Sequence, residues 1–335
     1  MALLELAIEL GASNTVIFKR GSGIVLREPS YIVVDDINHP NTAIAVGYGA
    51  KKMVGKTSDD VFVVNPISEG VISNPAATAL MLREFLTKVL DGNIFRERIK
   101  AVLVIPCGLE NKSKNMLQRL MFNLGINECY FVPSPLACAA NFTDLQNSGL
   151  SAVMVNIGGS VTDIAAVNNN NILYGFSMSV GGNHMDEAIC DYVQENFKVL
   201  ISQVVAEKVK LEAGSLYDND GASVEFSGAD NENKNPHVDV ISAYDIKQAV
   251  EPFYDMIIEG VETIINKCSP DVVSDIAQTG IYVCGGGANI TGLDTYFAKK
   301  LSLPVHISEE PHNVATRGLG KLLSNPEVLA KVIKK

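Results

Sequence analysis

Two stretches decide how this chain folds: Leu6–Phe18, which reads LAIELGASNTVIF, and Val153–Ala165, which reads VMVNIGGSVTDIA. In each, an apolar run ends at a glycine-containing turn and a second apolar run follows, as in two strands joined by a tight turn. An offset of 147 residues superimposes them without a gap. Five pairs then match: Glu9 with Asn156, Leu10 with Ile157, Gly11 with Gly158, Ser13 with Ser160, and Thr15 with Thr162. This match predicts an internal duplication, and chance similarity between two glycine-rich hairpins is the alternative.

Further strands and helices are expected on either side of both stretches. The expected strands cover residues 3–10, 15–19, 24–28, 100–106, 152–157, 163–167, 172–177 and 280–284. Asn74 followed by Pro75 predicts a helix start, and Asn183 is expected to cap another helix. Two more helices are expected from apolar residues at helical spacing: Leu117, Leu120, Met121 and Leu124, and then Val250, Phe253, Tyr254 and Ile257. With a surface hairpin and mobile loop at 218–239, the pattern predicts an α/β fold of two similar halves.

Composition excludes several classes of protein. Of the 335 residues, 47% are apolar and 19% are charged, which is typical of a globular chain of about two domains. The net charge of −11 argues against broad binding to nucleic acid, which needs clustered basic residues. No apolar run reaches the roughly 18 residues that span a bilayer, and the apolar start lacks the basic leader of a signal peptide. The cysteines and histidines show no metal-binding spacing, so we expect reduced thiols in the cytoplasm.

Glycine-rich turns are the candidate ligand sites. Gly11–Thr15 and Gly158–Thr162 offer backbone N–H groups that suit phosphate oxygens, although an ordinary hairpin explains either turn taken singly. The run Gly285–Gly287 after an apolar strand favours close packing of a flat or anionic group. Gly181 and Gly182 precede a predicted helix, whose N-terminus favours negative charge. Neither GxxxxGK[ST] nor GxGxxG is present, which argues against a P-loop enzyme and against a dehydrogenase.

Eight motifs occur in the order found in bacterial actins of the MreB type: ELGASNT, GIVLREPS, GYGAKKMVGKT, SEGVISN, NIGGSVTD, VGGNHMDEAI, AEKVKLEAG and GIYVCGGGANITGLD. The chain resembles that family from about Leu6 to Leu322. The resemblance implies an actin-like fold, in which two duplicated ribonuclease-H-like halves flank a nucleotide cleft. It places the first half at 1–29, 65–147 and 312–335 with a small insertion at 30–64, and the second half at 148–180 and 240–311 with a small insertion at 181–239.

The same resemblance implies that ATP and Mg²⁺ bind in the cleft, with Glu9 near the metal through water. Glu207 and Lys210, one helical turn apart, match the pair that contacts ribose and base, although a solvated pair on a helix also explains them. The other expected nucleotide contacts are Ala12, Ser13, Asn14, Gly158, Gly159, Ser160, Gly181, Gly182, Gly285, Gly286, Gly287 and Ala288.

Four positions depart from the family at the groups that drive hydrolysis. Glu9 and Asn156 stand where the family has Asp; Glu9 keeps the charge, whereas Asn156 loses it and cannot accept a proton. Ser113 replaces a Glu that positions the attacking water, and Val161 replaces a Thr that holds it. We therefore expect weak or absent ATP hydrolysis. The alternatives are that other groups restore hydrolysis, or that nucleotide binding is lost and the fold serves as a scaffold.

MreB relatives form paired protofilaments on the inner face of the cytoplasmic membrane. The resemblance therefore implies self-association, a peripheral membrane location and a role in cell shape, with an active paralogue as a further partner. Ile94 and Phe95, followed by Arg96 and Arg98, match the family's membrane-inserting loop, unless the apolar pair covers the core. Two other hypotheses are a fully active filament-forming ATPase and a sugar kinase or chaperone of the same superfamily, for which the chain offers no sugar pocket.

Overall fold

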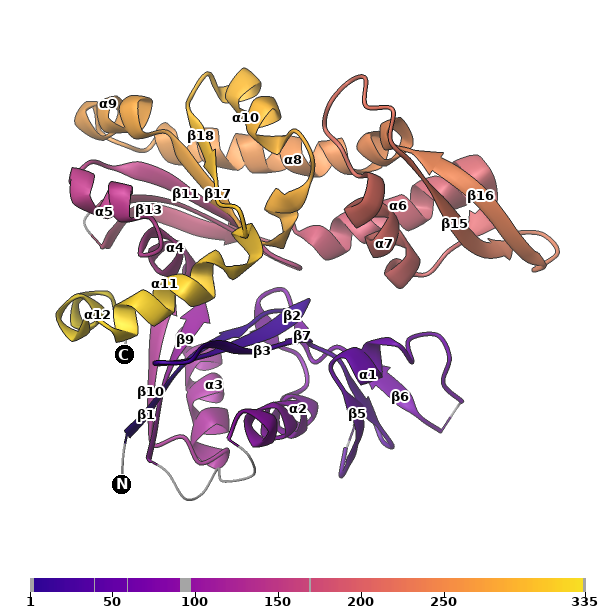
Figure 1. The fold of residues 1–335 in the computed structure, drawn as a ribbon, viewed down its shortest axis with the longest axis horizontal. Coiled ribbons are helices and arrows are strands. Elements are labelled where there is room, and N and C mark those ends of the chain that lie inside the picture. The colour runs from indigo at the N-terminus through magenta and orange to yellow at the C-terminus, as the bar shows by residue number, and fades with distance from the viewer. Residues whose placement is uncertain (1–2, 39, 59, 91–97, 169, 334–335) are drawn as a thin grey trace.

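Two five-stranded sheets organise the computed structural model, which describes residues 3–38, 40–58, 60–90, 98–168 and 170–333 (Figure 1). The first sheet has the order β10 (Glu128–Pro133), β9 (Arg98–Ile105), β1 (Leu3–Leu10), β2 (Asn14–Lys19) and β3 (Gly23–Pro29). The second has the order β18 (Val305–Ile307), β17 (Ile281–Cys284), β11 (Ala152–Ile157), β12 (Thr162–Asn168) and β13 (Asn171–Met178). The two orders are therefore equivalent, strand for strand.

Strand directions and turns match between the two sheets as well. β1 runs parallel to β9 and antiparallel to β2, and β11 runs parallel to β17 and antiparallel to β12. In the first turn the Gly11 N–H donates to the Asn14 carbonyl at 3.1 Å. In the second the Gly158 N–H donates to the Val161 carbonyl at 2.9 Å, at the same offset of 147 residues. The predicted α/β fold of two similar halves is confirmed.

Two small sheets lie at one end of the molecule (Figure 1). One contains β4 (Ile32–Val34), β5 (Ala43–Val46) and β6 (Phe62–Val64), and the other contains β14 (Val199–Leu200), β15 (Ser223–Asp230) and β16 (Pro236–Ser242). A short hairpin is formed by β7 (Ile67–Ser68) and β8 (Val71–Ile72). β15 and β16 confirm the hairpin predicted at 218–239. The division of the chain into halves and insertions at the residues given above stays a prediction.

Helices cover both faces of the large sheets. Their bounds are α1 (Tyr48–Lys51), α2 (Pro75–Val89), α3 (Asn111–Asn123), α4 (Ser134–Ala139), α5 (Thr143–Ser148), α6 (Gly182–Phe197), α7 (Gln203–Ala213), α8 (Ala243–Ile265), α9 (Pro270–Thr279), α10 (Leu293–Leu301), α11 (Val314–Leu323) and α12 (Pro326–Val332), with 3₁₀ turns η1 (Gly286–Asn289) and η2 (Pro311–Asn313). Asn74 caps α2 as predicted, accepting from the Ala77 N–H at 3.0 Å. Within the described ranges, no helix is long and apolar enough to cross a bilayer.

The start of α6 differs from the prediction. The helix begins at Gly182 with Gly181 as its cap, so the prediction that Asn183 caps it is wrong. The Asn183 N–H donates to the Gly159 carbonyl at 2.7 Å, while its side chain accepts from the Ser13 hydroxyl at 2.9 Å. The Asn183 side chain therefore contacts Ser13 of the other half and does not cap its own helix. Local sequence does not reveal this contact.

Each half has its own apolar core, and a third cluster joins the halves. This cluster contains Ala7 of the first large sheet, Met154 of the second, and Leu319 of α11. α11 also packs closely on α4, because a Cβ on Gly318 would lie 1.8 Å from the Ala137 carbonyl oxygen. The two halves are thus connected by buried apolar contact beneath the site described below.

We predict that Phe85→Ala lowers the free energy of unfolding by about 3–5 kcal/mol, because it empties a core position. Phe85 on α2 is fully buried, whereas Phe122 on α3 is 47% exposed. Phe122→Ala is the matched control and should change stability by less than about 0.5 kcal/mol. Urea unfolding followed by circular dichroism measures both. Equal losses in the two variants would contradict this placement of the core.

Candidate functional site

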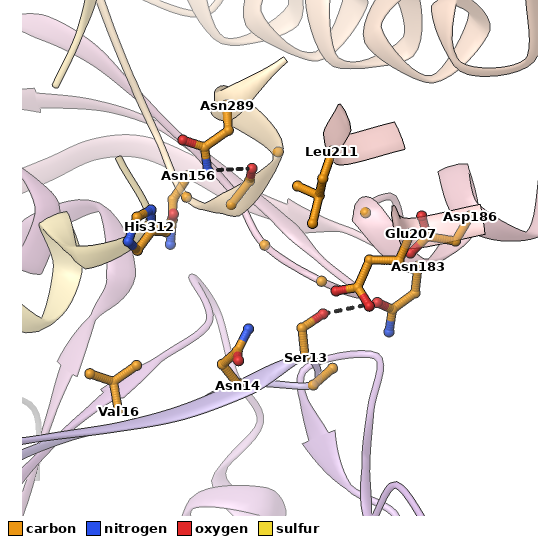
Figure 2. Close-up of a pocket in the computed structure, with 18 of the residues that line it drawn as sticks. Ser13, Asn14, Val16, Asn156, Asn183, Asp186, Glu207, Leu211, Asn289 and His312 are labelled. Atoms are coloured by element: carbon orange, nitrogen blue, oxygen red, sulfur yellow. Dashed lines mark hydrogen bonds between the residues drawn. The ribbon is translucent and has the colours of Figure 1, made fainter. Parts of the chain in front are cut away.

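A cavity of about 430 Å³ lies between the two halves (Figure 2). It brings together most of the predicted site residues: Glu9, Ala12, Ser13, Asn14, Asn156, Gly158, Gly159, Gly182, Glu207, Lys210, Gly285, Gly286 and Gly287. It is also lined by residues that sequence reasoning did not assign to a site: Val16, Arg27, Asn183, Asp186, Leu211, Asn289 and His312. Figure 2 shows Val16, Asn156 and His312 toward one end of the view, and Asp186 and Glu207 toward the other.

We name the two ends by their residues. The strand end is formed by Glu9, Val16, Arg27, Asn156 and His312, and the helix end by Asn183, Asp186, Glu207 and Lys210. The strand end contains the positions expected to act on phosphate and metal. The helix end contains the pair expected to act on ribose and base.

Three predicted nucleotide contacts lie behind the cavity wall. The Ser160 hydroxyl is buried and has no hydrogen-bond partner among the residues that the structure describes. A Cβ on Gly181 would lie 2.7 Å from the Gly158 carbonyl oxygen, so this glycine permits close packing behind the second turn. Ala288 belongs to the apolar core of the second half. These residues shape the wall without lining the cavity.

Two of the four predicted hydrolysis positions also lie outside the cavity. Ser113, in the first turn of α3, lines a separate gap of about 30 Å³ with Pro106 and Leu117. The Val161 side chain points toward the β7–β8 hairpin, where a Cβ on Gly70 would lie 3.3 Å from Val161 Cγ1. Neither residue presents a polar group to the cavity.

The two glycine turns meet at the middle of the cavity. A Cβ on Gly159 would lie 2.2 Å from Ser13 Oγ and 3.0 Å from the Ser13 backbone nitrogen, so only glycine fits here. The Ser13 hydroxyl then bridges to Asn183 on α6, a contact visible in Figure 2. Ser13 of the first half is therefore in contact with both the second turn and the helix that follows it.

The N-terminus of α6 is closed by backbone hydrogen bonds. The N–H groups of Gly182 and Asn183 donate to the carbonyls of Gly158 and Gly159, at 2.9 and 2.7 Å. Those of His184 and Met185 both donate to the Gly181 carbonyl. The first three of these N–H groups are among those that a helix leaves without intrahelical partners, and the bond from Met185 to Gly181 is the first i→i−4 hydrogen bond of the helix. Protein acceptors therefore engage the N–H groups of Gly182, Asn183 and His184, and the anion contact expected at Gly181 and Gly182 stays a prediction.

The helix end of the cavity is a network of opposite charges. Lys210 Nζ lies 2.7 Å from Asp186 Oδ1 and donates to the Gly182 carbonyl at 2.6 Å. Glu207 forms an ion pair with Lys51 at the end of α1, which lies in the chain between strands β5 and β6 of the first small sheet. Glu207 and Lys210 thus lie side by side as the sequence predicted, and each has a charged partner. Asp186 lies within the motif VGGNHMDEAI but was assigned no role, because a single carboxylate on a helix carries no diagnostic spacing.

Burial raises the pKa of Asp186 to about 6, and the neighbouring Lys210 opposes this rise without cancelling it. Its side chain is 8% exposed. The folded protein therefore takes up a proton at Asp186 more readily than the unfolded chain does. This makes Asp186 a pH-sensitive group inside the cavity.

At the strand end, Glu9, Val16 and Arg27 form one row across β1, β2 and β3. Glu9 pairs with Val16 and Val16 pairs with Arg27, so the three side chains share a face of the sheet. Glu9 accepts a hydrogen bond from the Thr316 hydroxyl at 2.5 Å. Burial raises the pKa of Glu9, while Thr316 and the positive charge of Arg27 lower it. The carboxylate is thus held in place between α11 and a cation.

Asn156 and Asp163 occupy the equivalent place in the second half. The Asn156 amide donates to the Ser134 hydroxyl at 2.7 Å, which fixes the orientation of the side chain. Asp163 is buried away from the cavity, accepts from the Cys107 N–H at 2.7 Å and also accepts from the Ser177 hydroxyl. Burial raises the pKa of Asp163. At the strand end of the cavity, the second half therefore presents an amide where the first half presents a carboxylate.

The cavity suits a nucleotide better than a metal ion held by protein ligands. Its volume lies within the range of small-molecule pockets. A Cβ on Gly286 would meet nothing within 4 Å, so the chain there faces open space, whereas one on Gly287 would overlap Ile157. Across the described ranges, no group of three or more His, Cys, Asp or Glu is placed to hold a metal ion. Mg²⁺ would depend on Glu9, water and the oxygens of its ligand.

We predict that Asp186→Asn removes a pH dependence of stability between about pH 4 and pH 6. The pKa of Asp186 rises from its ordinary value of 3.8 to about 6 on folding, so protonated Asp186 contributes to the stability of wild type. This stabilisation is fully present below about pH 4 and is lost as the pH rises through about 6. The stability of the variant relative to wild type should therefore rise by about 3 kcal/mol from pH 4 to pH 7.

Urea unfolding at several pH values measures this difference. Asp191→Asn, at an exposed position of the same helix, is the control for loss of one carboxylate. A constant difference between Asp186→Asn and wild type across this range would contradict the prediction.

The chain matches the family model described as MreB/Mbl protein over residues 4–331. It is 30% identical to the cell shape-determining protein MreB of Escherichia coli (strain K12) over 322 residues, which are 95% of this chain and 93% of that protein. It is 27% identical to the cell shape-determining protein Mbl of Bacillus subtilis (strain 168), covering 98% of both chains. The crystal structure of MreB5 of Spiroplasma citri bound to ADP superimposes with a TM-score of 0.91 at 26% identity, over 98% of this chain and 99% of that chain. The crystal structure of MreB5 bound to AMPPNP gives the same TM-score at 27% identity. The fold is therefore actin-like, and the chain belongs to the MreB/Mbl family.

Proposed function

We propose that this protein binds ATP in the cavity and assembles into filaments that serve cell shape, with weak or absent ATP hydrolysis. The observation that carries the proposal is the meeting of two equivalent glycine turns at a cavity of suitable size. Two further findings support it. MreB5 of Spiroplasma citri, which has the same fold, was solved with ADP and with AMPPNP, and the E. coli and B. subtilis relatives are cell shape-determining proteins.

Binding would use backbone more than side chains. The turns at Ala12–Asn14 and Gly158–Gly159 would receive the phosphates, and Gly285–Gly287 would pack on the adenosine. Glu207 and Lys210 would contact ribose and base from the helix end. When bound, Mg²⁺ would supply positive charge to the phosphate oxygens, with Glu9 as the protein group on its side of the cavity.

Hydrolysis would lack a positioned base. Ser113 lines a different gap, and Val161 turns an apolar side chain toward the β7–β8 hairpin. The Asn156 amide is occupied by Ser134 and cannot take a proton. Glu9 remains an acceptor, but it is held by the Thr316 hydroxyl. An attacking water would thus meet no free carboxylate from the positions that the family uses.

We predict that the protein, incubated with Mg²⁺ and ATP and then desalted, retains ATP with little ADP after hours. The double variant Ser113→Glu, Val161→Thr should raise phosphate release at least about 10-fold, because a positioned base contributes 10²–10⁴-fold in enzymes. Chromatography of the retained nucleotide and a phosphate assay give the readouts.

The double variant Ser113→Gln, Val161→Thr is the matched control, since it has the same length without the charge. Retained ADP and released phosphate from wild type would show an active ATPase and contradict the impaired-hydrolysis proposal. Retention of no nucleotide would instead favour the scaffold hypothesis.

Head-to-tail assembly is supported by apolar residues exposed on the small sheets. Val238 and Val240 on β16 are 59% and 53% exposed, and Ile44 on β5 is 52% exposed. Both small sheets lie at one end of the molecule, so one subunit would present them to the opposite end of the next (Figure 1). Contacts between unlike surfaces of identical subunits produce open filaments when the rotation from one subunit to the next does not close a ring. Co-assembly with an active paralogue would use the same surfaces.

We also propose a cytoplasmic protein bound peripherally to the inner membrane face. Ile94, Phe95 and Arg96 lie outside the described residues, so the sequence pattern alone supports this proposal. Arg98 begins β9 and donates to Glu128 at 2.7 Å, which engages one of the two arginines expected at lipid headgroups. Membrane affinity would come from many such loops along a filament.

We predict that wild type with ATP sediments alone and floats with vesicles that contain anionic lipid. Ile94→Ser, Phe95→Ser should sediment as wild type does but lose most of its flotation. The double variant Val238→Ser, Val240→Ser should instead no longer assemble and so no longer sediment. It should also lose flotation, because single subunits bind the membrane weakly. Unchanged flotation of the first variant would contradict the loop assignment, and unchanged sedimentation of the second would contradict the assembly surface.

A further inference from the structure

Arg27 is a cationic residue at the strand end that the family motifs gave no reason to place in the site. It lines the cavity in one row with Glu9 and Val16. This row lies two residues from the first turn, or about 7 Å along the strands. A phosphate group seated on that turn would therefore lie within reach of a long guanidinium side chain.

The guanidinium is held in place by neutral acceptors. Its Nη2 donates to the His312 carbonyl and to Asn313 Oδ1, both at 2.7 Å. Its Nε is buried and has no hydrogen-bond partner among the residues that the structure describes. Arg27 also forms no ion pair with any residue that the structure describes. Among these residues, Lys210 and His312 are the other basic side chains that line the cavity, and Lys210 forms an ion pair with Asp186. Arg27 is thus oriented while its charge is not neutralised by direct contact.

The charges at the strand end therefore differ from those of a metal-centred site. Among the residues that the structure describes, Glu9 is the only carboxylate that lines this end, and Arg27 lies on the same face two strands away. A fixed cation beside Glu9 opposes the approach of a divalent cation and attracts phosphate, whose planar oxygens suit a guanidinium.

We infer that Arg27 is a phosphate-binding residue, which supplies in the protein itself part of the positive charge that Mg²⁺ would otherwise bring to the nucleotide. The inference rests on the proposed nucleotide binding. It predicts that binding of ATP persists without Mg²⁺, and that this persistence depends on Arg27.

Equilibrium binding of ATP and of adenosine, each in Mg²⁺ and in EDTA, tests the inference. Wild type should lose less than about 10-fold in ATP affinity on chelation. Arg27→Gln should weaken ATP binding in EDTA by about 10- to 100-fold, as expected for loss of a charged hydrogen bond, and leave adenosine binding unchanged. Arg27→Lys should fall between the two, because it keeps the charge without the fork of donors.

Arg83→Gln, which removes one charge from an exposed position of α2, is the control and should bind as wild type does. Equal ATP binding by Arg27→Gln and wild type, or equal losses for ATP and adenosine, would overturn the inference while leaving nucleotide binding in place. If Arg27→Gln does not fold, a loss of ATP affinity above about 10-fold by wild type in EDTA would overturn the inference. Failure of wild type to bind ATP in any buffer would instead refute the proposed function.

Discussion

The close approach of the two glycine turns is the constraint on which the rest of the site depends. Gly159 lies against Ser13 with no room for a Cβ, and the Ser13 hydroxyl reaches Asn183 on α6. Because the carbonyls of Gly158 and Gly159 also close the start of that helix, the second turn sets the position of α6. A side chain at Gly159 would separate the halves and change both walls of the cavity together.

This approach is possible because the halves are already held together beneath it. α11 packs on α4 at Gly318, and its apolar face belongs to a core that draws residues from both large sheets. α11 also provides Thr316, whose hydroxyl holds Glu9 in place. Asn313, which directly precedes α11, accepts a hydrogen bond from Arg27. One helix thus connects the halves and orients the charged groups at the strand end, so packing and electrostatics are coupled there.

The sequence predicted what is repeated or local, and it failed where the fold brings distant residues together. The offset of 147 residues between Gly11 and Gly158 predicted the duplication, and Asn74 predicted a helix start. Asn183 was assigned by the local rule for caps, but a contact 170 residues away determines its role. Arg27 lies within the motif GIVLREPS but was assigned no role, because only the register of three strands and the loop at His312 place it at the cavity.

The same distinction underlies the proposal that this chain binds a nucleotide but hydrolyses it weakly or not at all. Phosphate recognition by a turn depends on backbone geometry, which Gly11 and Gly158 preserve whatever side chains follow them. Activation of water depends on particular side-chain atoms, and one substitution can remove them, as we propose for Asn156 and Val161. A duplicated fold can therefore lose its catalytic groups and keep its cavity. The role inferred for Arg27 carries this argument one step further, since a single side chain on the same scaffold of strands would change which charges a ligand must bring with it.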